Sequence, residues 1–234
     1  TANCVRYMGA KVVFADVHPD TLNIDPEKIR NCLSPKTKAI IVVDFTGHPV
    51  ELEIIGKIAK ENNLVLIEDA AHALGASYKN KPVGSISDMT AFSLHPVKNI
   101  TTGEGGMALT NNDIVVNRLL HLRNSGNTRN KLFMQPRPEN EIWNYQQIEL
   151  GFNYRMTDIQ AALGLSQMRR LDQYINIRRE IAKRYDSELN SLPLKIPYQL
   201  SKTYSSYHLY PICISVNETK KTQKQIYDVL WKNN

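Results

Sequence analysis

The sequence predicts an α/β protein with a mostly parallel sheet between helices, and three observations lead to this prediction. Short apolar runs alternate with helical patterns over the first hundred residues. The runs are apolar at successive residues, not at alternate ones, as a sheet covered on both faces requires. The order strand, helix, strand, helix, strand calls for right-handed crossovers. Ligands in such sheets collect beyond the carboxyl ends of the strands, so we look for a site there.

The predicted strands are short apolar runs bounded by turn residues, at residues 12–14, 39–43, 64–67, 89–93 and 107–110. The predicted helices of this half show apolar residues one turn apart, between residues 26 and 33, from 54 to 59, and around Leu119 and Leu120. The first residues, from Thr1 to Cys4, also have a helical pattern. Each strand is therefore followed by a segment that can cover the sheet.

The second half of the chain begins with a long irregular segment. Residues 124–150 show little periodicity, and a loop of this length is usually disordered or functional, so we expect a lid or a subunit contact. Thr157 and Gln160 have the spacing of a capping box and begin a helix that is predicted to reach about Leu189. A strand at residues 207–216 and a helix at residues 222–231 are expected to follow.

Two prolines mark the expected domain boundary. Pro193 and Pro197 end the helical structure, which predicts a large domain at residues 1–190 and the beginning of a small α/β domain at residues 191–234. Both ends of the chain fall inside helical patterns. We therefore expect the N-terminal part of the large domain and the remainder of the small domain to be missing from this sequence.

The composition of the 234 residues is that of an ordinary globular protein, with a net charge of +6. No long uncharged apolar run predicts a membrane span, and no secretory signal is present at the start, so a cytoplasmic protein is expected. The three cysteines are scattered and are expected to be reduced. The basic residues lack interleaved aromatic residues, which argues against nucleic acid and leaves solvated helix faces or an anionic substrate.

Three side chains follow or end predicted strands and form the candidate site. Asp69 ends a strand, where its carboxylate could hold a protonated pyridine nitrogen, cap the next segment or contact a metal. Lys98 lies in a loop between two strands, where partial burial would favour the nucleophilic free amine, whereas a solvated lysine would be unremarkable. Ser93 and the glycines at 103, 105 and 106 could bind phosphate, although such turns are common.

Two further residues have weaker signals. His72 could stack on a cofactor ring or serve only the structure. Asn153 precedes the capped helix, where its amide could donate to an anion, or it could be a turn residue. The remaining histidines (His18, His48, His95, His121 and His208) are interpreted as structural. No set of His, Cys and Asp residues has metal-ligand spacing, so no metal is predicted.

Taken together, three long blocks resemble the DegT/DnrJ/StrS family of sugar aminotransferases, which are pyridoxal phosphate (PLP) enzymes of fold type I. The blocks are Glu68–Ala73, Phe92–Gly106 and Gly151–Ala162, and they occur in the family's order. The resemblance implies the fold type I large domain for residues 1–190. It also selects the cofactor interpretation of Asp69, Lys98 and Ser93 over the structural ones.

The resemblance implies a role for each candidate residue. Lys98 would form the Schiff base with pyridoxal 5'-phosphate and act as the catalytic residue. Asp69 would bind the pyridine nitrogen, His72 would lie against the cofactor, and Ser93 would hold its phosphate. Asn153 would reach the phosphate bound by a neighbouring subunit, which implies a homodimer with shared sites. A lysine at position 98 favours transamination over dehydration, because some dehydrating members have histidine there.

Within the family the chain is most similar to the branch that acts in pseudaminic acid synthesis, through Asp44–Val50, the lysine loop and Ser206–Ile212. This resemblance implies transfer of an amino group from glutamate to C4 of a UDP-linked 4-keto-6-deoxy-N-acetylhexosamine. Two alternatives remain open. One is a PLP-dependent sugar dehydratase or an aminotransferase of another keto sugar, and the other is a non-catalytic regulator that binds a nucleotide sugar.

Overall fold

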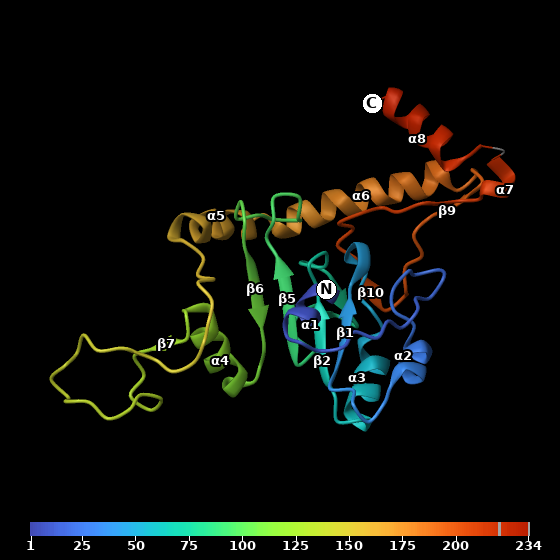
Figure 1. Ribbon diagram of the computed structural model, residues 1–234. Helices are drawn as coiled ribbons and strands as arrows, with labels where there is room; N and C mark the ends of the chain where they lie inside the picture. Colours follow the sequence, from blue (N-terminus) through green and yellow to red (C-terminus); the bar gives the residue numbers. More distant parts are fainter. Residues whose placement is uncertain (220, 234) are drawn as a thin grey trace.

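The computed structural model describes residues 1–219 and 221–233. Its central element is a four-stranded sheet in the order β1-β2-β5-β6, formed by Ala39–Val43 (β1), Val65–Asp69 (β2), Met89–Ser93 (β5) and Gly106–Leu109 (β6). β1, β2 and β5 are parallel, whereas β6 pairs with β5 in the antiparallel sense. Figure 1 shows β1, β2 and β5 running toward the same edge and β6 running back. The mostly parallel sheet is thus confirmed.

The helices begin and end at residues that suit those positions. Asp25 caps Pro26–Cys32 (α2), and its side chain accepts from the N–H of Glu27. Asn112 caps the helix after β6 in the same way. The helices of the first half, besides α2, are Ala2–Tyr7 (α1), the 3-10 turn Phe45–Gly47 (η1), Leu52–Glu61 (α3) and Asp113–Arg123 (α4). The positions of α1, α2, α3 and α4 agree with the predicted helical patterns, whereas η1 was not predicted.

The main core lies between one face of the sheet and α3. Ile40, Val42 and Leu66 from the strands pack with Ile55 and Ile58 of α3, and all five are buried. A fully buried side chain of this size contributes about 1.5–3 kcal/mol. The other sheet face is only partly covered: in β5, Ala91 is exposed and Ser93 is intermediate. The sequence predicted a sheet covered on both faces, but the structure covers one face fully and the other only in part.

The C-terminal half contains two consecutive helices where one was predicted. Thr157 and Gln160 form the predicted capping box at the start of Asp158–Met168 (α5). The chain then turns at Arg169 and Arg170, and Leu171–Leu189 (α6) crosses beyond the carboxyl ends of the parallel strands (Figure 1). The prediction of a single long helix was wrong, because the apolar face continues through Met168 and Leu171 and does not reveal a break between them.

Two predicted strands are not formed as expected. Residues 12–14 form no strand, and their backbone does not pair with the sheet. The nearest pairing is an isolated bridge between Val17 and Ile24. Of residues 207–216, Cys213–Ile214 (β11) is a strand, paired with Leu194–Lys195 (β9). The remaining elements are Ser77–Tyr78 (β3), Lys81–Pro82 (β4), Asn127–Thr128 (β7), Gln146–Gln147 (β8), Thr203–Tyr204 (β10), Val216–Thr219 (α7) and Gln223–Lys232 (α8).

The segment of residues 124–150, predicted as irregular, contains only the short β7 and β8 pairing. Figure 1 shows it extending away from the sheet beyond α4. Its role as a lid or subunit contact stays a prediction. The domain division at residue 190 also stays a prediction. Residues 220 and 234, which belong to the predicted small domain, lie outside the described residues.

Candidate active site

Two strand ends present polar side chains on the same face of the sheet. Asp69 is the last residue of β2 and pairs in register with Ala91 of β5. Because side chains alternate along a strand, Asp69, Ala91 and Ser93 all point to the partly covered face. Asp69 accepts a hydrogen bond from the N–H of Ala71 (3.2 Å) and a short one from the hydroxyl of Thr1. A carboxylate and a hydroxyl thus lie at the carboxyl edge, as predicted.

The loop that carries Lys98 is fixed on both sides of the lysine. The N–H of Lys98 donates to the carbonyl of His95 (3.0 Å), and the side chain of Asn99 donates to the carbonyl of Leu74 (2.9 Å). Ile100 is buried in a cluster with Leu171 of α6. The backbone at Lys98 is therefore held between the sheet and α6.

The environment of Lys98 favours its free amine. Burial lowers the pKa of the Lys98 ammonium, because a charged group loses hydration there, and the negative charge of Asp69 opposes part of this shift. The net pKa lies below the ordinary lysine value. The structure therefore brings Asp69 and Lys98 within electrostatic reach of each other and makes the lysine a better nucleophile than a solvated one.

His72 lies in the same cluster. The N–H of Thr46 donates to its Nδ1 (3.3 Å), so the neutral ring carries its proton on Nε2. Burial lowers the pKa of His72, the positive charge of Lys98 lowers it further, and Asp69 acts in the opposite direction. His72 is thus a neutral imidazole at neutral pH, and its ring is held by the loop that follows β1.

His208, which the sequence analysis interpreted as structural, lies in the same cluster as His72. Its ring centroid lies 4.5 Å from that of His72, and its Nδ1 is buried with no hydrogen-bond partner among the described residues. Burial, then the positive charges of His72, Lys98 and Arg178, lower the pKa of His208 to about 4. The block Ser206–Ile212 was noticed for its resemblance, but no periodicity in it indicated that the histidine would meet residues far away in the chain.

Serines and a glycine fasten the His208 segment to the cluster. Ser205 Oγ donates to the carbonyl of Gly47 (3.0 Å), and Ser206 Oγ donates to the carbonyl of His72 (2.8 Å). Gly47 has a φ of +94°, and a Cβ there would lie 2.8 Å from that carbonyl of His72. Arg178 of α6 donates to the carbonyl of His208 (3.3 Å). The loop after β1, the loop after β2 and residues 205–208 therefore form one unit.

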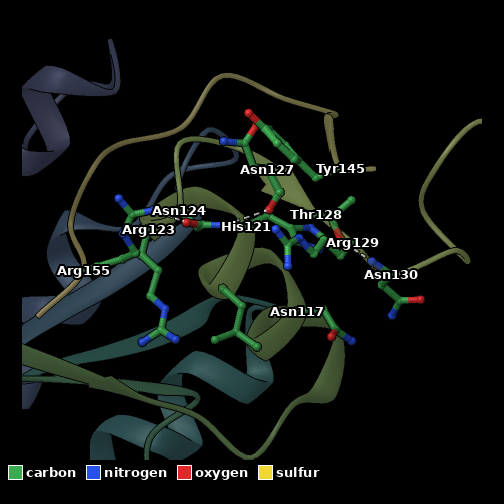
Figure 2. Close-up of a pocket in the computed structure, with 11 residues that line it drawn as sticks. Asn117, His121, Arg123, Asn124, Asn127, Thr128, Arg129, Asn130, Tyr145 and Arg155 are labelled. Atoms are coloured by element: carbon green, nitrogen blue, oxygen red, sulfur yellow. Dashed lines mark hydrogen bonds between the residues drawn. The ribbon is translucent and has the colours of Figure 1, made fainter. Parts of the chain in front are cut away.

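Asn153 lies elsewhere, beside a separate cavity. Its side-chain oxygen accepts from Arg155 Nη2 (2.9 Å), and its backbone bridges to Asn124. Arg155 and Asn124 line a cavity of about 730 Å³ between α4 and the segment of residues 124–150. Figure 2 shows Arg123, Asn124 and Arg155 on one side of this cavity and Arg129, Asn130 and Tyr145 on the other. Asn153 is therefore connected to residues that line this cavity.

The residues present fit PLP. Asp69 can accept from a protonated pyridine nitrogen, and Lys98 offers a partly desolvated amine for the aldehyde. Ser93 Oγ accepts a long hydrogen bond from the N–H of His95 (3.4 Å), and in the described chain its own proton has no acceptor, so it is available to an anion. Ala91, which pairs with Asp69 in the sheet, is exposed on the same face.

The whole chain, residues 1–234, matches the model of the DegT/DnrJ/EryC1/StrS aminotransferase family. The chain belongs to this family. The family is PLP-dependent, which confirms the cofactor expected from the sequence. The resemblance drawn from the three blocks is likewise confirmed.

Among the relatives, a UDP-4-amino-4,6-dideoxy-N-acetyl-beta-L-altrosamine transaminase of Campylobacter jejuni is 42% identical over 92% of this chain and 55% of its own length. The uncharacterized protein MJ1066 of Methanocaldococcus jannaschii is 41% identical over 100% of this chain and 60% of its own. The solved structure of Helicobacter pylori PseC, an aminotransferase of pseudaminic acid biosynthesis, aligns over the full chain and 60% of its own, with a TM-score of 0.90 and 33% identity.

These comparisons confirm the fold type I architecture. The chain spans 55–60% of the length of these relatives. Within the described residues, no helix is both long and apolar enough to cross a membrane. The same residues contain no group of three or more His, Cys, Asp or Glu side chains placed to hold a metal.

Proposed function

We propose that the protein is a PLP-dependent nucleotide-sugar aminotransferase, with Lys98 as the catalytic residue. The observation that carries the proposal is the pairing of a partly buried lysine with a carboxylate, Asp69, at the carboxyl edge of a parallel sheet. When bound, PLP supplies an electron-withdrawing ring next to the carbon that exchanges the amino group. The remaining chemistry is assigned to side chains of this chain.

Lys98 Nζ is proposed to bind the cofactor and then to move a proton at the reacting carbon, because its lowered pKa leaves more of the amine unprotonated than in a solvated lysine. Asp69 keeps the pyridine nitrogen protonated through a charge-assisted hydrogen bond. His72, neutral and fixed by Thr46, would lie against the ring of the bound cofactor without adding a charge. Ser93 donates its hydroxyl to the phosphate.

Asn153 is proposed to act on the phosphate bound by a second subunit, in a homodimer with shared sites. Arg155 occupies the oxygen of the Asn153 amide, so the NH₂ group is the part left to donate to an anion. The contacts of Asn153 with Arg155 and Asn124, which line the cavity of Figure 2, support a role at a site other than that of Lys98 in its own chain. We also propose a cytoplasmic location.

The proposed substrate is a UDP-linked 4-keto-6-deoxy-N-acetylhexosamine that receives an amino group at C4 from glutamate, in surface-sugar synthesis of the pseudaminic acid type. The similarity to transaminases of that pathway in Campylobacter jejuni and Helicobacter pylori supports this choice. No nucleic acid or membrane partner is part of the proposal.

The test uses the full-length protein that contains this chain. Borohydride reduction should bleach the cofactor absorbance and attach the reduced pyridoxyl group to the peptide that carries Lys98. Lys98→Ala should lower amine transfer from glutamate to the keto sugar by at least about 10³-fold. The exposed Lys57→Ala serves as the matched control and should retain wild-type turnover. Labelling of another lysine would refute the assignment, and release of a dehydrated sugar would identify a dehydratase instead.

A further inference from the structure

Two buried acids, Glu68 and Asp44, lie behind the candidate site, on the side of the sheet opposite Asp69. Glu68 precedes Asp69 and is 0% exposed. Its Oε2 accepts hydrogen bonds from the hydroxyls of Ser87 and Thr90, both at 3.0 Å. Its Oε1 is also buried and has no hydrogen-bond partner among the described residues. A buried carboxylate with an unsatisfied oxygen calls for a further proton donor.

Asp44, the first residue after β1, has the complementary arrangement. It is 0% exposed, and its Oδ1 accepts from the N–H of Val50 (3.0 Å). Its Oδ2 is buried and, like Glu68 Oε1, lacks a donor in the described part of the chain. The two side chains lie close enough for the charge of Glu68 to act on Asp44. One proton placed between the two unsatisfied oxygens would satisfy both.

Two charged carboxylates cannot share a fully buried site without a large cost. The hydrogen bonds decide which acid keeps the proton: two hydroxyls stabilise the charge on Glu68, whereas Asp44 has only the N–H of Val50. Burial raises the pKa of Asp44 well above its ordinary value, and the negative charges of Glu68 and Asp69 raise it further. His48, on the same loop, supplies no compensating charge at neutral pH, because burial lowers its pKa to about 4.

We propose that Asp44 is a neutral acid at physiological pH that donates its Oδ2–H to Glu68 Oε1, and that this positioning pair clamps the Asp44–Val50 loop onto β2. The inference goes beyond the proposed function, because it concerns the support of the site and is independent of the sugar and of the cofactor.

The clamped loop holds three parts of the candidate site. The N–H of Asp44 donates to the carbonyl of Asp69 (3.1 Å), and the N–H of Thr46 donates to His72. Gly47 accepts from the residues that precede His208. Loss of the shared proton would place two repelling charges at the base of this loop. The histidines would then lose their positions relative to Asp69.

The first test measures unfolding of the full-length protein against pH, from roughly pH 5 to 9, for wild type and Asp44→Asn. Asparagine can accept from Val50 and donate to Glu68, but it cannot ionise. A carboxyl whose pKa is raised on folding stabilises the protein at low pH, and this contribution is lost as the pH rises toward the folded pKa. The wild-type unfolding constant should therefore increase relative to that of Asp44→Asn by up to about tenfold per pH unit.

The exposed Asp172→Asn is the matched control, and it should keep the wild-type pH dependence. Parallel pH profiles of wild type and Asp44→Asn would overturn the proposal. Infrared spectra of the wild type provide a measurement that needs no variant: a protonated carboxyl band at neutral pH supports the neutral acid, and absence of any such band rejects it.

The positioning role is tested by the nitrogen NMR signals of His72. Asp44→Asn should preserve the signal of Nδ1 as a hydrogen-bond acceptor, because the loop keeps both of its side-chain hydrogen bonds. Asp44→Ala removes both and should shift that signal toward the value of a solvated histidine. An unchanged His72 signal in a folded Asp44→Ala protein would show that the pair does not position the site.

Discussion

Glu68 and Asp69 are adjacent carboxylates on the same strand, yet they lie in opposite environments. Glu68 points into the covered face, where it is fully buried and receives two hydroxyl hydrogen bonds. Asp69 points to the partly covered face, where its negative charge raises the pKa of both Lys98 and His72 against the effect of burial. The period of two along a strand therefore separates a structural acid from a chemical one. The two acids therefore differ in the face of the sheet that they occupy, and only Asp69 is proposed to take part in the chemistry.

Among the substitutions that test this comparison, we expect the largest effect, a loss of turnover, at Asp69. Asp69→Asn removes the charge that would hold a protonated pyridine nitrogen but leaves a side chain of the same size on the partly covered face. We expect turnover to fall by roughly 10³-fold, with little change in the free energy of unfolding. Steady-state kinetics and denaturant unfolding of the full-length protein measure the two quantities. A stability loss as large as the loss of turnover would contradict the chemical role.

Glu68→Ala should have the opposite profile. It removes the acceptor of Ser87, Thr90 and the proposed Asp44 proton from a fully buried position, so we expect a loss of about 3 kcal/mol in stability. Chemical denaturation checks this value. The exposed Glu188→Ala, which removes only a surface ion pair with Arg184, is the control and should change stability by less than about 0.5 kcal/mol.

A smaller effect is expected from His48, which is 1% exposed and lies at the base of the same loop. Burial lowers the pKa of His48 to about 4 from an ordinary value of 6.5. The neutral ring therefore stabilises the fold above pH 6.5, and this contribution is lost as the pH falls from about 6.5 toward 4. His48→Gln should remove up to about 3 kcal/mol of this acid dependence. Unfolding curves at several acidic pH values provide the measurement.

The smallest expected effect is at Gly47. Its positive φ and the nearby carbonyl of His72 make Gly47→Ala strained, so we expect a destabilisation of about 1–2 kcal/mol. Because Gly47 accepts from the segment before His208, the affinity for PLP should also fall, and a cofactor titration measures this. Gly9→Ala has a similar positive φ but open space around the new methyl group, and it should leave that affinity unchanged.

The sequence was sufficient to predict those parts of the site that depend on local order. Asp69, Ser93 and Lys98 end strands or follow them directly, so strand prediction alone places them at one edge of the sheet. The Thr157 capping box was also correct, since all of its atoms come from four consecutive residues. His72 lies near Asp69 and Lys98 for the same reason, because it follows β2 by three residues.

Other features depend on contacts between distant residues. His208 meets His72 across 136 positions of the chain, and the serines that bring it there look like ordinary loop residues in the sequence. The pairing of Asp44 with Glu68 depends on the register of β1 with β2, which apolar runs do not reveal. The break at Arg169 leaves the apolar pattern unchanged, so periodicity could not detect it.

The anchored backbone at Lys98 has a kinetic consequence. Asn99 and Ile100 fix the main chain, so only the four-carbon side chain of the lysine is free to move. If Lys98 holds PLP as proposed, this tether would keep its amine close to the bound cofactor, at an effective molarity far above that of any lysine in solution.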